Sequence, residues 1–241
     1  MTVNKVYIAG NWKMNLHREE SVELLKGLRE GKIPSQVEAI LCPPFLRLEG
    51  AAELLEGSPY KLGAQDVSKY ENGAHTGEIS ASMLKDLGLS YVIVGHSELR
   101  GEGQTDEEVS QKVRAALREG LVPIVCLGES EEEYDRGLSL ETVARQLEES
   151  VLSLSPEEAE KVILAYEPLW AIGTGKNCPP EVAQEVAAHL KGKLKVPVLY
   201  GGSVKGNNAG EYLSCQDIDG VLVGGASLKA EEFLTIVEAA L

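Results

Sequence analysis

The stretch VILAYEPLWAIGTGK, residues 162–176, contains the unit from which the chain is built. Val162–Ala165 is a short apolar run rich in branched side chains, which favours a buried β-strand. Glu167 follows the strand, Pro168 fixes the backbone after it, and a loop of small residues leads to a helix expected over Pro180–Leu190. A buried strand that continues through a polar loop into a helix is the repeating unit of a parallel α/β sheet.

The same alternation recurs along the whole chain. Strands are expected at Val6–Ala9, Val37–Cys42, Lys61–Ala64, Tyr91–Val94, Val122–Cys126, Val162–Ala165, Val196–Tyr200 and Gly220–Val223. Amphipathic helices are expected at Ser21–Glu30, Arg47–Glu56, Ser80–Leu87, Asp106–Glu119, Leu140–Leu152, Pro180–Leu190, Asn208–Ser214 and Ala230–Ala240. Eight such units without a flexible linker predict a closed (β/α)8 barrel, one domain over residues 1–241. A doubly wound open sheet is the alternative, but it leaves the count of eight and the even spacing unexplained.

The composition restricts the class of protein. The 241 residues are 43% hydrophobic, which is enough apolar material for one large core. A formal charge of −15 disfavours binding to nucleic acid and to anionic membranes, and no apolar run approaches the roughly 20 residues that span a bilayer. There is no signal-peptide pattern at the start, and the four cysteines form no Cys-x-x-Cys pair. We therefore expect a cytoplasmic protein without disulfides.

Residues just past the expected strands are the candidates for chemistry, because the strands of a barrel all end at the same rim. Lys13, His96 and Glu167 lie at such positions, and so do the glycine pairs in Gly201-Gly202-Ser203 and Gly224-Gly225. Each signal alone has a plain structural explanation: a solvated lysine, a solvated carboxylate, or a sharp turn. Their joint occurrence at one rim favours a functional site.

These residue types suggest specific roles. Glu167 has the setting of a general base under a lid, and Lys13, oriented by Asn11, supplies a mobile positive charge. If Ser97 begins a short helix, the helix N-terminus holds the ring of His96 neutral, so that it can donate to a carbonyl oxygen. Glycine-rich loops after the last two strands allow backbone N–H groups to approach a phosphate.

Other motifs are incomplete. Around Gly173 and Lys176 the chain does not match a P-loop, because Trp170 replaces the early glycine and Asn177 stands where Ser or Thr is required. It does not match a dinucleotide fingerprint either, because no further glycine follows at the required position. No lysine is placed for Schiff-base chemistry at the sixth strand, and no cluster has metal-ligand spacing. We therefore expect no metal and no cofactor.

Several motifs together resemble one known family. They are Ala9-Gly10-Asn11-Trp12-Lys13-Met14-Asn15, Cys42-Pro43-Pro44, Gly63-Ala64-Gln65, Gly73-Ala74-His75-Thr76-Gly77-Glu78, Val94-Gly95-His96-Ser97-Glu98, Ala165-Tyr166-Glu167-Pro168, Ala171-Ile172-Gly173-Thr174-Gly175, Tyr200-Gly201-Gly202-Ser203 and Val223-Gly224-Gly225-Ala226-Ser227-Leu228. In this order, along the whole chain, they resemble the triosephosphate isomerases, which have the TIM-barrel fold. The resemblance implies interconversion of dihydroxyacetone phosphate and D-glyceraldehyde 3-phosphate, in glycolysis and gluconeogenesis, without a cofactor.

The resemblance also implies a role for each matched residue. Glu167 moves a proton between C1 and C2, His96 polarises the carbonyls, Lys13 neutralises charge and Asn11 positions it. The lid corresponds to Pro168–Lys176. The backbone N–H groups of Gly173, Ser203, Gly224 and Gly225 are expected to hold the phosphate, and Ile172 and Leu222 are expected to clamp the base in a dry site. Glu129 is expected to accept from the indole of Trp170 in the open lid, and Ser97 and Glu98 support the site.

The resemblance implies a homodimer formed through the Gln65–Glu78 loop, with Thr76 reaching toward Asn11 and Glu98 of a second copy. The segment Leu99–Thr105 departs from the family pattern, because it lacks one arginine and an aromatic residue and is one residue shorter. We expect a homodimer, and a weakened dimer is the competing prediction.

Two other functions stay open from the sequence. The chain could be a catalytically silent phosphate-binding barrel, or an isomerase of another small sugar phosphate. The presence of Lys13, His96 and Glu167 together argues against the silent barrel.

Overall fold

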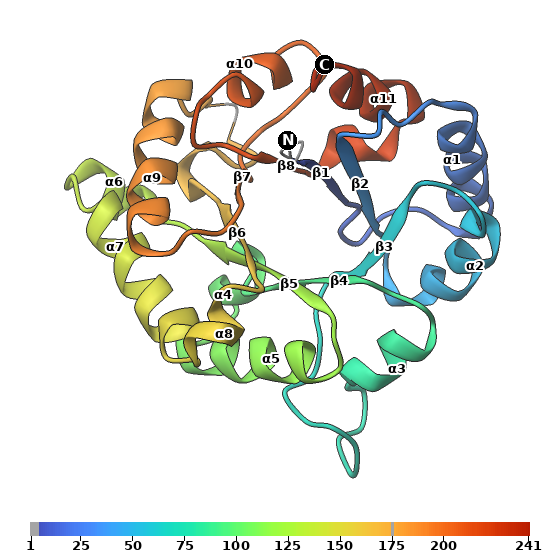
Figure 1. Cartoon of the computed structure of the whole chain (residues 1–241), viewed down its shortest axis with the longest axis horizontal. Coiled ribbons are helices and arrows are strands. Elements are labelled where there is room, and N and C mark those ends of the chain that lie inside the picture. Colours follow the sequence, from blue (N-terminus) through green and yellow to red (C-terminus); the bar gives the residue numbers. More distant parts are fainter. Residues whose placement is uncertain (1–4, 175) are drawn as a thin grey trace.

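The computed structural model describes residues 5–174 and 176–241. Within these residues, eight parallel strands form a closed barrel in sequence order, and helices surround it (Figure 1). The strands are β1 (Val6–Asn11), β2 (Val37–Cys42), β3 (Lys61–Ala64), β4 (Tyr91–Val94), β5 (Val122–Leu127), β6 (Ile163–Tyr166), β7 (Val198–Tyr200) and β8 (Gly220–Val223). The predicted (β/α)8 barrel is confirmed.

The barrel closes because β1 pairs with both β2 and β8, with Ile8 beside Ala39 on one side and Val221 on the other. Side chains alternate along each strand between the barrel interior and the helices, as the twofold period of a strand requires. In β4, Ile93 packs inside the barrel, whereas its neighbour Val94 packs in the layer under the helices. Both faces of the strands are therefore buried, which explains their nearly continuous apolar sequences.

The α-helices form the outer ring (Figure 1). They are α1 (Arg18–Glu30), α2 (Phe45–Leu55), α3 (Ala81–Asp86), α4 (Ser97–Gly101), α5 (Asp106–Arg118), α6 (Glu131–Asp135), α7 (Ser139–Leu147), α8 (Pro156–Ala159), α9 (Pro180–Lys193), α10 (Ala209–Leu213) and α11 (Ala230–Glu238). Helix α5 shows why they form: Thr105 caps its first turn by accepting from the N–H of Glu108 at 3.2 Å, and Val109, Val113 and Ala116 bury one stripe against the barrel.

The structure differs from the sequence-based expectations in several places, and it adds the short elements α4, α8 and η2 (Leu169–Ala171) to the expected helices. The helix expected over Leu140–Leu152 is α7 followed by a π-helical turn, η1 (Glu148–Leu152). A short 3₁₀ helix, η3 (Gly225–Leu228), begins directly after β8, but after β7 the chain stays non-helical until α10. Helix α6 was not expected, because Tyr134 is its one aromatic or apolar residue and a single such side chain makes no apolar stripe.

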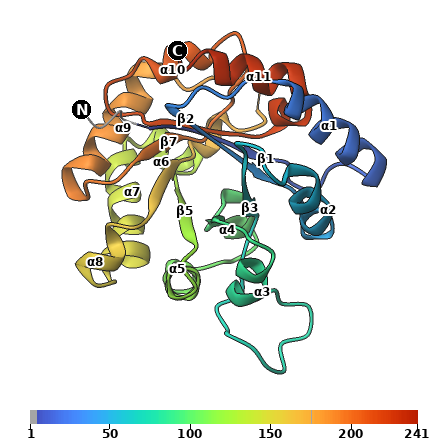
Figure 2. The same cartoon turned by 45° about the vertical axis from the view of Figure 1, so that its right-hand side comes forward.

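The Gln65–Glu78 loop projects from the barrel between β3 and α3 (Figure 2). All four cysteines are free thiols. No helix among the described residues has both the length and the apolar character needed to cross a membrane. In the same residues, no group of three or more His, Cys, Asp or Glu side chains could hold a metal ion.

Candidate active site

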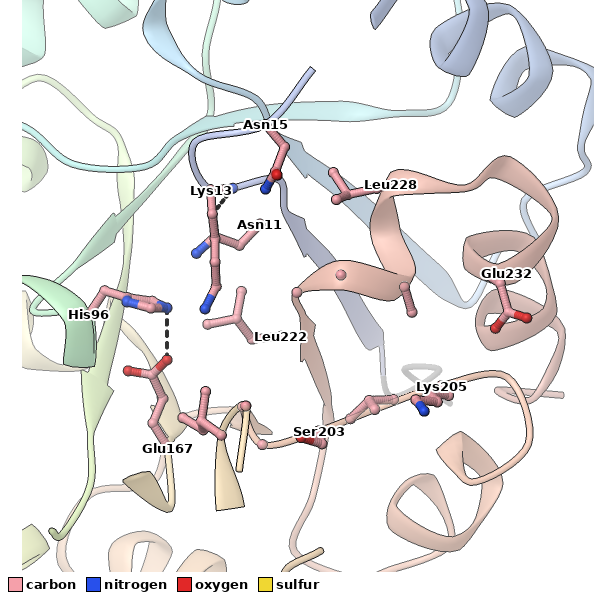
Figure 3. Close-up of a pocket in the computed structure, with 18 of the residues that line it drawn as sticks. Asn11, Lys13, Asn15, His96, Glu167, Ser203, Lys205, Leu222, Leu228 and Glu232 are labelled. Carbon is pink, nitrogen blue, oxygen red and sulfur yellow. Dashed lines mark hydrogen bonds and ion pairs between the residues drawn. The ribbon is translucent and has the colours of Figure 1, made fainter. Parts of the chain in front are cut away.

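A cavity of about 690 Å³ opens at the C-terminal ends of the strands (Figure 3). Side chains and backbone from the ends of β1, β4, β6, β7 and β8 line it, so residues distant in sequence share one space. Those predicted to act and found in its lining are Asn11, Lys13, His96, Glu167, Ile172, Gly173, Ser203, Leu222, Gly224 and Gly225. The barrel therefore brings together most of the predicted site.

Glu167 lies just beyond β6 with its side chain buried. Its Oε1 atom is 3.0 Å from Nε2 of His96 (Figure 3). Its Oε2 atom accepts from the backbone N–H of Ser97 at 2.8 Å. Gly128 packs against the backbone carbonyl of Glu167, and Gly201 packs against its side chain. A Cβ at Gly201 would lie 2.9 Å from Cγ of Glu167, and one at Gly128 would overlap the Glu167 carbonyl oxygen. The Glu167 side chain thus lies in a narrow slot beside Gly201, and it lines the cavity.

His96 caps α4, which begins at Ser97, so the condition set in the sequence analysis for a helix at this position is met. Its Nδ1 accepts from the backbone N–H of Glu98 at 3.2 Å. The Nδ1 atom therefore carries no proton, and the ring is the neutral tautomer with its N–H at Nε2. The Glu98 carboxylate, at 3.7 Å from Nδ1, is too distant for a hydrogen bond. The Nε2–H group thus donates toward Glu167.

Lys13 has a left-handed backbone, with φ of 51°, and its N–H donates to Oδ1 of the buried Asn11 at 3.0 Å. The ammonium Nζ lies 2.6 Å from Oε1 of Glu98. Gln65 adds a bond from its Nε2 to the Lys13 carbonyl at 2.9 Å, a contact for which the sequence analysis assigned no role. Burial alone would raise the pKa of Glu98, but the hydrogen bond and charge of Lys13 hold that pKa below its usual range.

The opposite wall of the cavity is mainly backbone. Gly201, Gly202 and Ser203 follow β7, and Gly224 and Gly225 follow β8. In the described part of the chain, the N–H groups of Ser203, Gly224 and Gly225 donate to no backbone carbonyl. Free N–H groups beside the start of η3 form a surface that suits a phosphate dianion.

The comparison with known families agrees with this geometry. The family model described as triosephosphate isomerase matches residues 6–240. This chain belongs to the triosephosphate isomerase family. The triosephosphate isomerase of Alkaliphilus oremlandii is 46% identical over 246 residues, which covers 98% of this chain and 99% of that protein. That of Bordetella pertussis is 48% identical over 239 residues, covering 96% of each.

A further relative, from Nitrosococcus oceani, is 47% identical over 245 residues, covering 97% of this chain and 98% of its own. Triosephosphate isomerases interconvert dihydroxyacetone phosphate and D-glyceraldehyde 3-phosphate, a step of glycolysis. The chain is an enzyme with that activity and a triose phosphate is its substrate. The cavity thus has a known class of ligand, a three-carbon sugar phosphate.

The family's lid, Pro168–Lys176, borders the cavity through Ile172 and Gly173. It begins with a 3₁₀ turn, η2 (Leu169–Ala171), whereas Gly173 and Thr174 are exposed; Gly175 lies outside the described residues. Ser203 donates from Oγ to the Ala171 carbonyl at 2.9 Å. The segment therefore borders the cavity through Ile172 and Gly173 while Gly173 and Thr174 are exposed to solvent.

The Trp170 indole donates to Oε1 of Glu129 at 2.8 Å, as the sequence predicted for the open lid. Tyr166 donates to the same oxygen at 2.9 Å. Glu129 is fully buried, and this burial raises its pKa although the two donors oppose the shift. The sequence analysis missed the Tyr134 ring, which stacks on Trp170 and belongs to the unexpected helix α6.

Proposed function

We propose that Glu167 is the base that moves a proton between C1 and C2 of the triose phosphate. Its carboxylate removes a proton from C1 of dihydroxyacetone phosphate, and the electron pair forms the C1–C2 double bond of an enediolate. The proton of the C1 hydroxyl passes to the oxygen on C2. The same carboxyl then returns a proton to C2, and the C1–O bond becomes the aldehyde carbonyl. The close packing of Gly201 on the Glu167 side chain and of Gly128 on the Glu167 backbone supports this role, because a base must be positioned accurately near both carbons.

His96 is proposed to stabilise the oxygen on which charge develops. Its Nε2–H donates to the substrate oxygen once Glu167 has turned toward the carbons. Ser97 and Glu98 support this role, because the Glu98 N–H fixes the tautomer and the Ser97 N–H holds the resting carboxylate. A donor that stays neutral polarises the carbonyl without trapping the enediolate as an ion pair.

Lys13 is proposed to neutralise the negative charge of the substrate, with Asn11 fixing the backbone that carries it. The phosphate is held by the main-chain N–H groups of Gly173, Ser203, Gly224 and Gly225. The protein is acidic overall, which opposes binding of a dianion. The short-range attraction of the backbone N–H groups and the ammonium of Lys13 overcome this repulsion within the site. Closure of the lid brings in Gly173, and Ile172 and Leu222 then enclose the base in a dry site.

The observation that carries this proposal is the 3.0 Å contact between Nε2 of His96 and Oε1 of Glu167, in the cavity that also holds the phosphate-binding backbone. Shortening the base by Glu167→Asp is expected to lower kcat on the order of 100-fold, with inorganic phosphate binding nearly unchanged. The matched control is Glu157→Asp, an exposed residue on α8. Equal turnover of the Glu167→Asp variant and the wild type would reject Glu167 as the base.

We also propose a homodimer formed through the Gln65–Glu78 loop, with Thr76 entering the site of a second copy near Asn11 and Glu98. Large apolar side chains are exposed on Met14, Leu46 and Tyr70. Exposed apolar groups of this size favour a protein interface. A sedimentation measurement at micromolar concentration tests the dimer, and a monomer with full turnover would contradict it.

The Leu99–Thr105 segment bears on the strength of that dimer. Arg100, the arginine that the segment retains, turns inward: it donates to the carbonyls of Gly95 at 2.7 Å and Cys126 at 3.2 Å and pairs with Asp106. It is thus engaged within its own subunit. We propose that the Gln65–Glu78 loop therefore contributes a larger share of the dimer contact here than in relatives that have the second arginine.

A cytoplasmic location and a single domain over residues 1–241 complete the proposal. The free thiols of all four cysteines support the location, since reducing compartments keep thiols free. The closed sheet that includes every strand supports the single domain. Cell fractionation tests the location, and one cooperative unfolding transition is expected for the domain.

A further inference from the structure

Helix α6, Glu131–Asp135, has no part in the proposed chemistry, yet the structure fixes it firmly. Ser130 accepts from the N–H of Glu133 at 3.3 Å, and the Glu133 carboxylate accepts from the N–H of Ser130 at 2.8 Å. This reciprocal capping box defines the first turn of the helix. A short polar helix with such a cap is a rigid platform beside the lid.

Two side chains of this platform contact the lid, one near each end. The ring of Tyr134 stacks on Trp170, with centroids 4.0 Å apart and planes at 24°. Glu131 forms an ion pair with Lys176. Within the lid, Thr174 ties the two ends together, because its Oγ1 donates to the Trp170 carbonyl at 2.7 Å and accepts from the N–H of Lys176 at 3.2 Å.

These contacts belong to the open lid. Gly173 and Thr174 are exposed while Trp170 is buried against Tyr134 and Glu129. If the lid closes over a bound phosphate, its ends must move relative to a helix that is fixed by its own cap. The stack and the ion pair therefore add to the stability of the open state and are lost or weakened in the closed one.

We propose that α6 is a latch for the open lid, in which Tyr134 and Glu131 are positioning residues that set the balance between open and closed enzyme. The inference rests on the proposed closure of the lid over the triose phosphate. An aromatic stack shifts such an equilibrium roughly two- to tenfold. An exposed ion pair shifts it by up to about fivefold.

The latch makes a directional prediction for ligand binding. Weakening the open state leaves more closed enzyme, so a ligand that requires closure binds more tightly. The probe is 2-phosphoglycolate, whose carboxylate and phosphate resemble the charged ends of the enediolate. Its Kd is expected to fall roughly two- to tenfold in Tyr134→Leu. The KM of Tyr134→Leu for dihydroxyacetone phosphate is expected to fall in parallel with this Kd, whereas its kcat/KM should not fall.

Each test variant has a matched control that separates a latch from a merely structural effect. The control for Tyr134→Leu is Tyr134→Phe, which keeps the ring and is expected to bind 2-phosphoglycolate like the wild type. The second test variant is Glu131→Gln, and its control is Glu132→Gln. Glu131→Gln is expected to lower Kd by up to about fivefold. Glu132→Gln removes the same charge from the same helix, but Glu132 faces Arg136 at 3.7 Å and not the lid, so its Kd should not change.

Trp170 itself gives a spectroscopic readout. The chain has two tryptophans, and Trp12 is fully buried in the core. The emission of ligand-free Tyr134→Leu is expected to shift toward that of the ligand-bound wild type, whereas Tyr134→Phe keeps the ligand-free spectrum of the wild type.

Equal Kd values for Tyr134→Leu and Tyr134→Phe, or weaker binding by Tyr134→Leu, would overturn the latch. If Tyr134→Leu does not fold, the comparison of Glu131→Gln with Glu132→Gln decides alone, and equal Kd values there overturn it. A failure of the catalytic proposal has a different signature. It appears as full turnover in Glu167→Asp. The Kd values of the Tyr134 and Glu131 variants for 2-phosphoglycolate would still test the latch in that case.

Discussion

Glu98 connects two of the groups proposed to act on the substrate. Its Oε1 accepts from Nζ of Lys13 at 2.6 Å, while its own backbone N–H donates to Nδ1 of His96 at 3.2 Å. The side chain therefore positions the ammonium, and the backbone sets the tautomer of the imidazole. One residue at the start of α4 thus helps to hold both of the donors that face the substrate.

The two contacts of Glu98 can be separated by Glu98→Gln. The backbone bond to His96 is kept, whereas Lys13 loses its charged partner. We expect kcat to fall on the order of tenfold because the ammonium is no longer held in place. A coupled isomerase assay measures this change. Unchanged turnover would show that Lys13 needs no help from Glu98.

The same pair makes a prediction about stability and pH. The pKa of Glu98 is lowered in the folded protein, so its contribution is present above the unfolded-state pKa of about 4.3 and is lost as pH falls through the lowered value. Because the Glu98 side chain is more than half exposed, this contribution is below about 1 kcal/mol. The free energies of urea unfolding of wild type and Glu98→Gln should differ at pH 6, and the difference should shrink as the pH falls below the unfolded-state pKa of about 4.3. A constant difference would contradict the lowered pKa.

The slot around the base can be narrowed directly. Gly201→Ala places a methyl group 2.9 Å from Cγ of Glu167 and 3.1 Å from the carbonyl of Tyr166. The displaced carboxylate should lower kcat on the order of 100-fold, with phosphate inhibition nearly unchanged. Gly210→Ala on α10 is the control, since its Cβ would meet no atom within 4 Å. Equal kcat values for the two variants would argue against a tightly positioned base.

The Gln65–Glu78 loop is anchored to α5 by three ion pairs, which supports its proposed role in the dimer. Asp66 pairs with Lys112 at 2.6 Å, Lys69 with Glu108 at 3.2 Å, and Glu71 with Arg118. The first of these is the least exposed. A loop that is already ordered loses less entropy when it docks onto a partner.

Lys112→Met removes the most buried of these anchors. We expect the dissociation constant of the dimer to rise on the order of tenfold, because the loop loses its preferred position before docking. Sedimentation over a range of concentrations measures it. The control is Lys191→Met, which breaks a pair with Asp219 of similar length, 2.8 Å, on a different helix. If both variants associate like the wild type, the loop needs no anchor.

The strands of the barrel were predictable because both of their faces are buried. Val37–Cys42, Tyr91–Val94 and Gly220–Val223 have the bounds expected from their apolar runs. The residues at the rim of the barrel could then be predicted as site residues, since all parallel strands of one barrel end at the same face. Glu167 and His96 lie at strand ends of this kind, although their 3.0 Å contact depends on the detailed packing.

Other parts of the site could not be predicted, because they depend on how separate segments dock. Helix α6 has no apolar period and is defined by its capping box. The stack of Tyr134 in α6 on Trp170 in η2 joins two segments that are remote in sequence, and no sequence pattern links the two residues. The contact of the Ser97 N–H with Glu167 likewise requires the closed barrel.

Solvent isotope incorporation tests the central claim most directly, that the Glu167 carboxyl moves the proton between C1 and C2. The wild-type enzyme, converting dihydroxyacetone phosphate in D₂O, is expected to give glyceraldehyde 3-phosphate with deuterium at C2, because the proton on the carboxyl exchanges before it is returned. Glu167→Gln has the same shape without a base, and its rate of incorporation should fall on the order of 10²- to 10⁴-fold. Incorporation by Glu167→Gln at the wild-type rate would contradict the account.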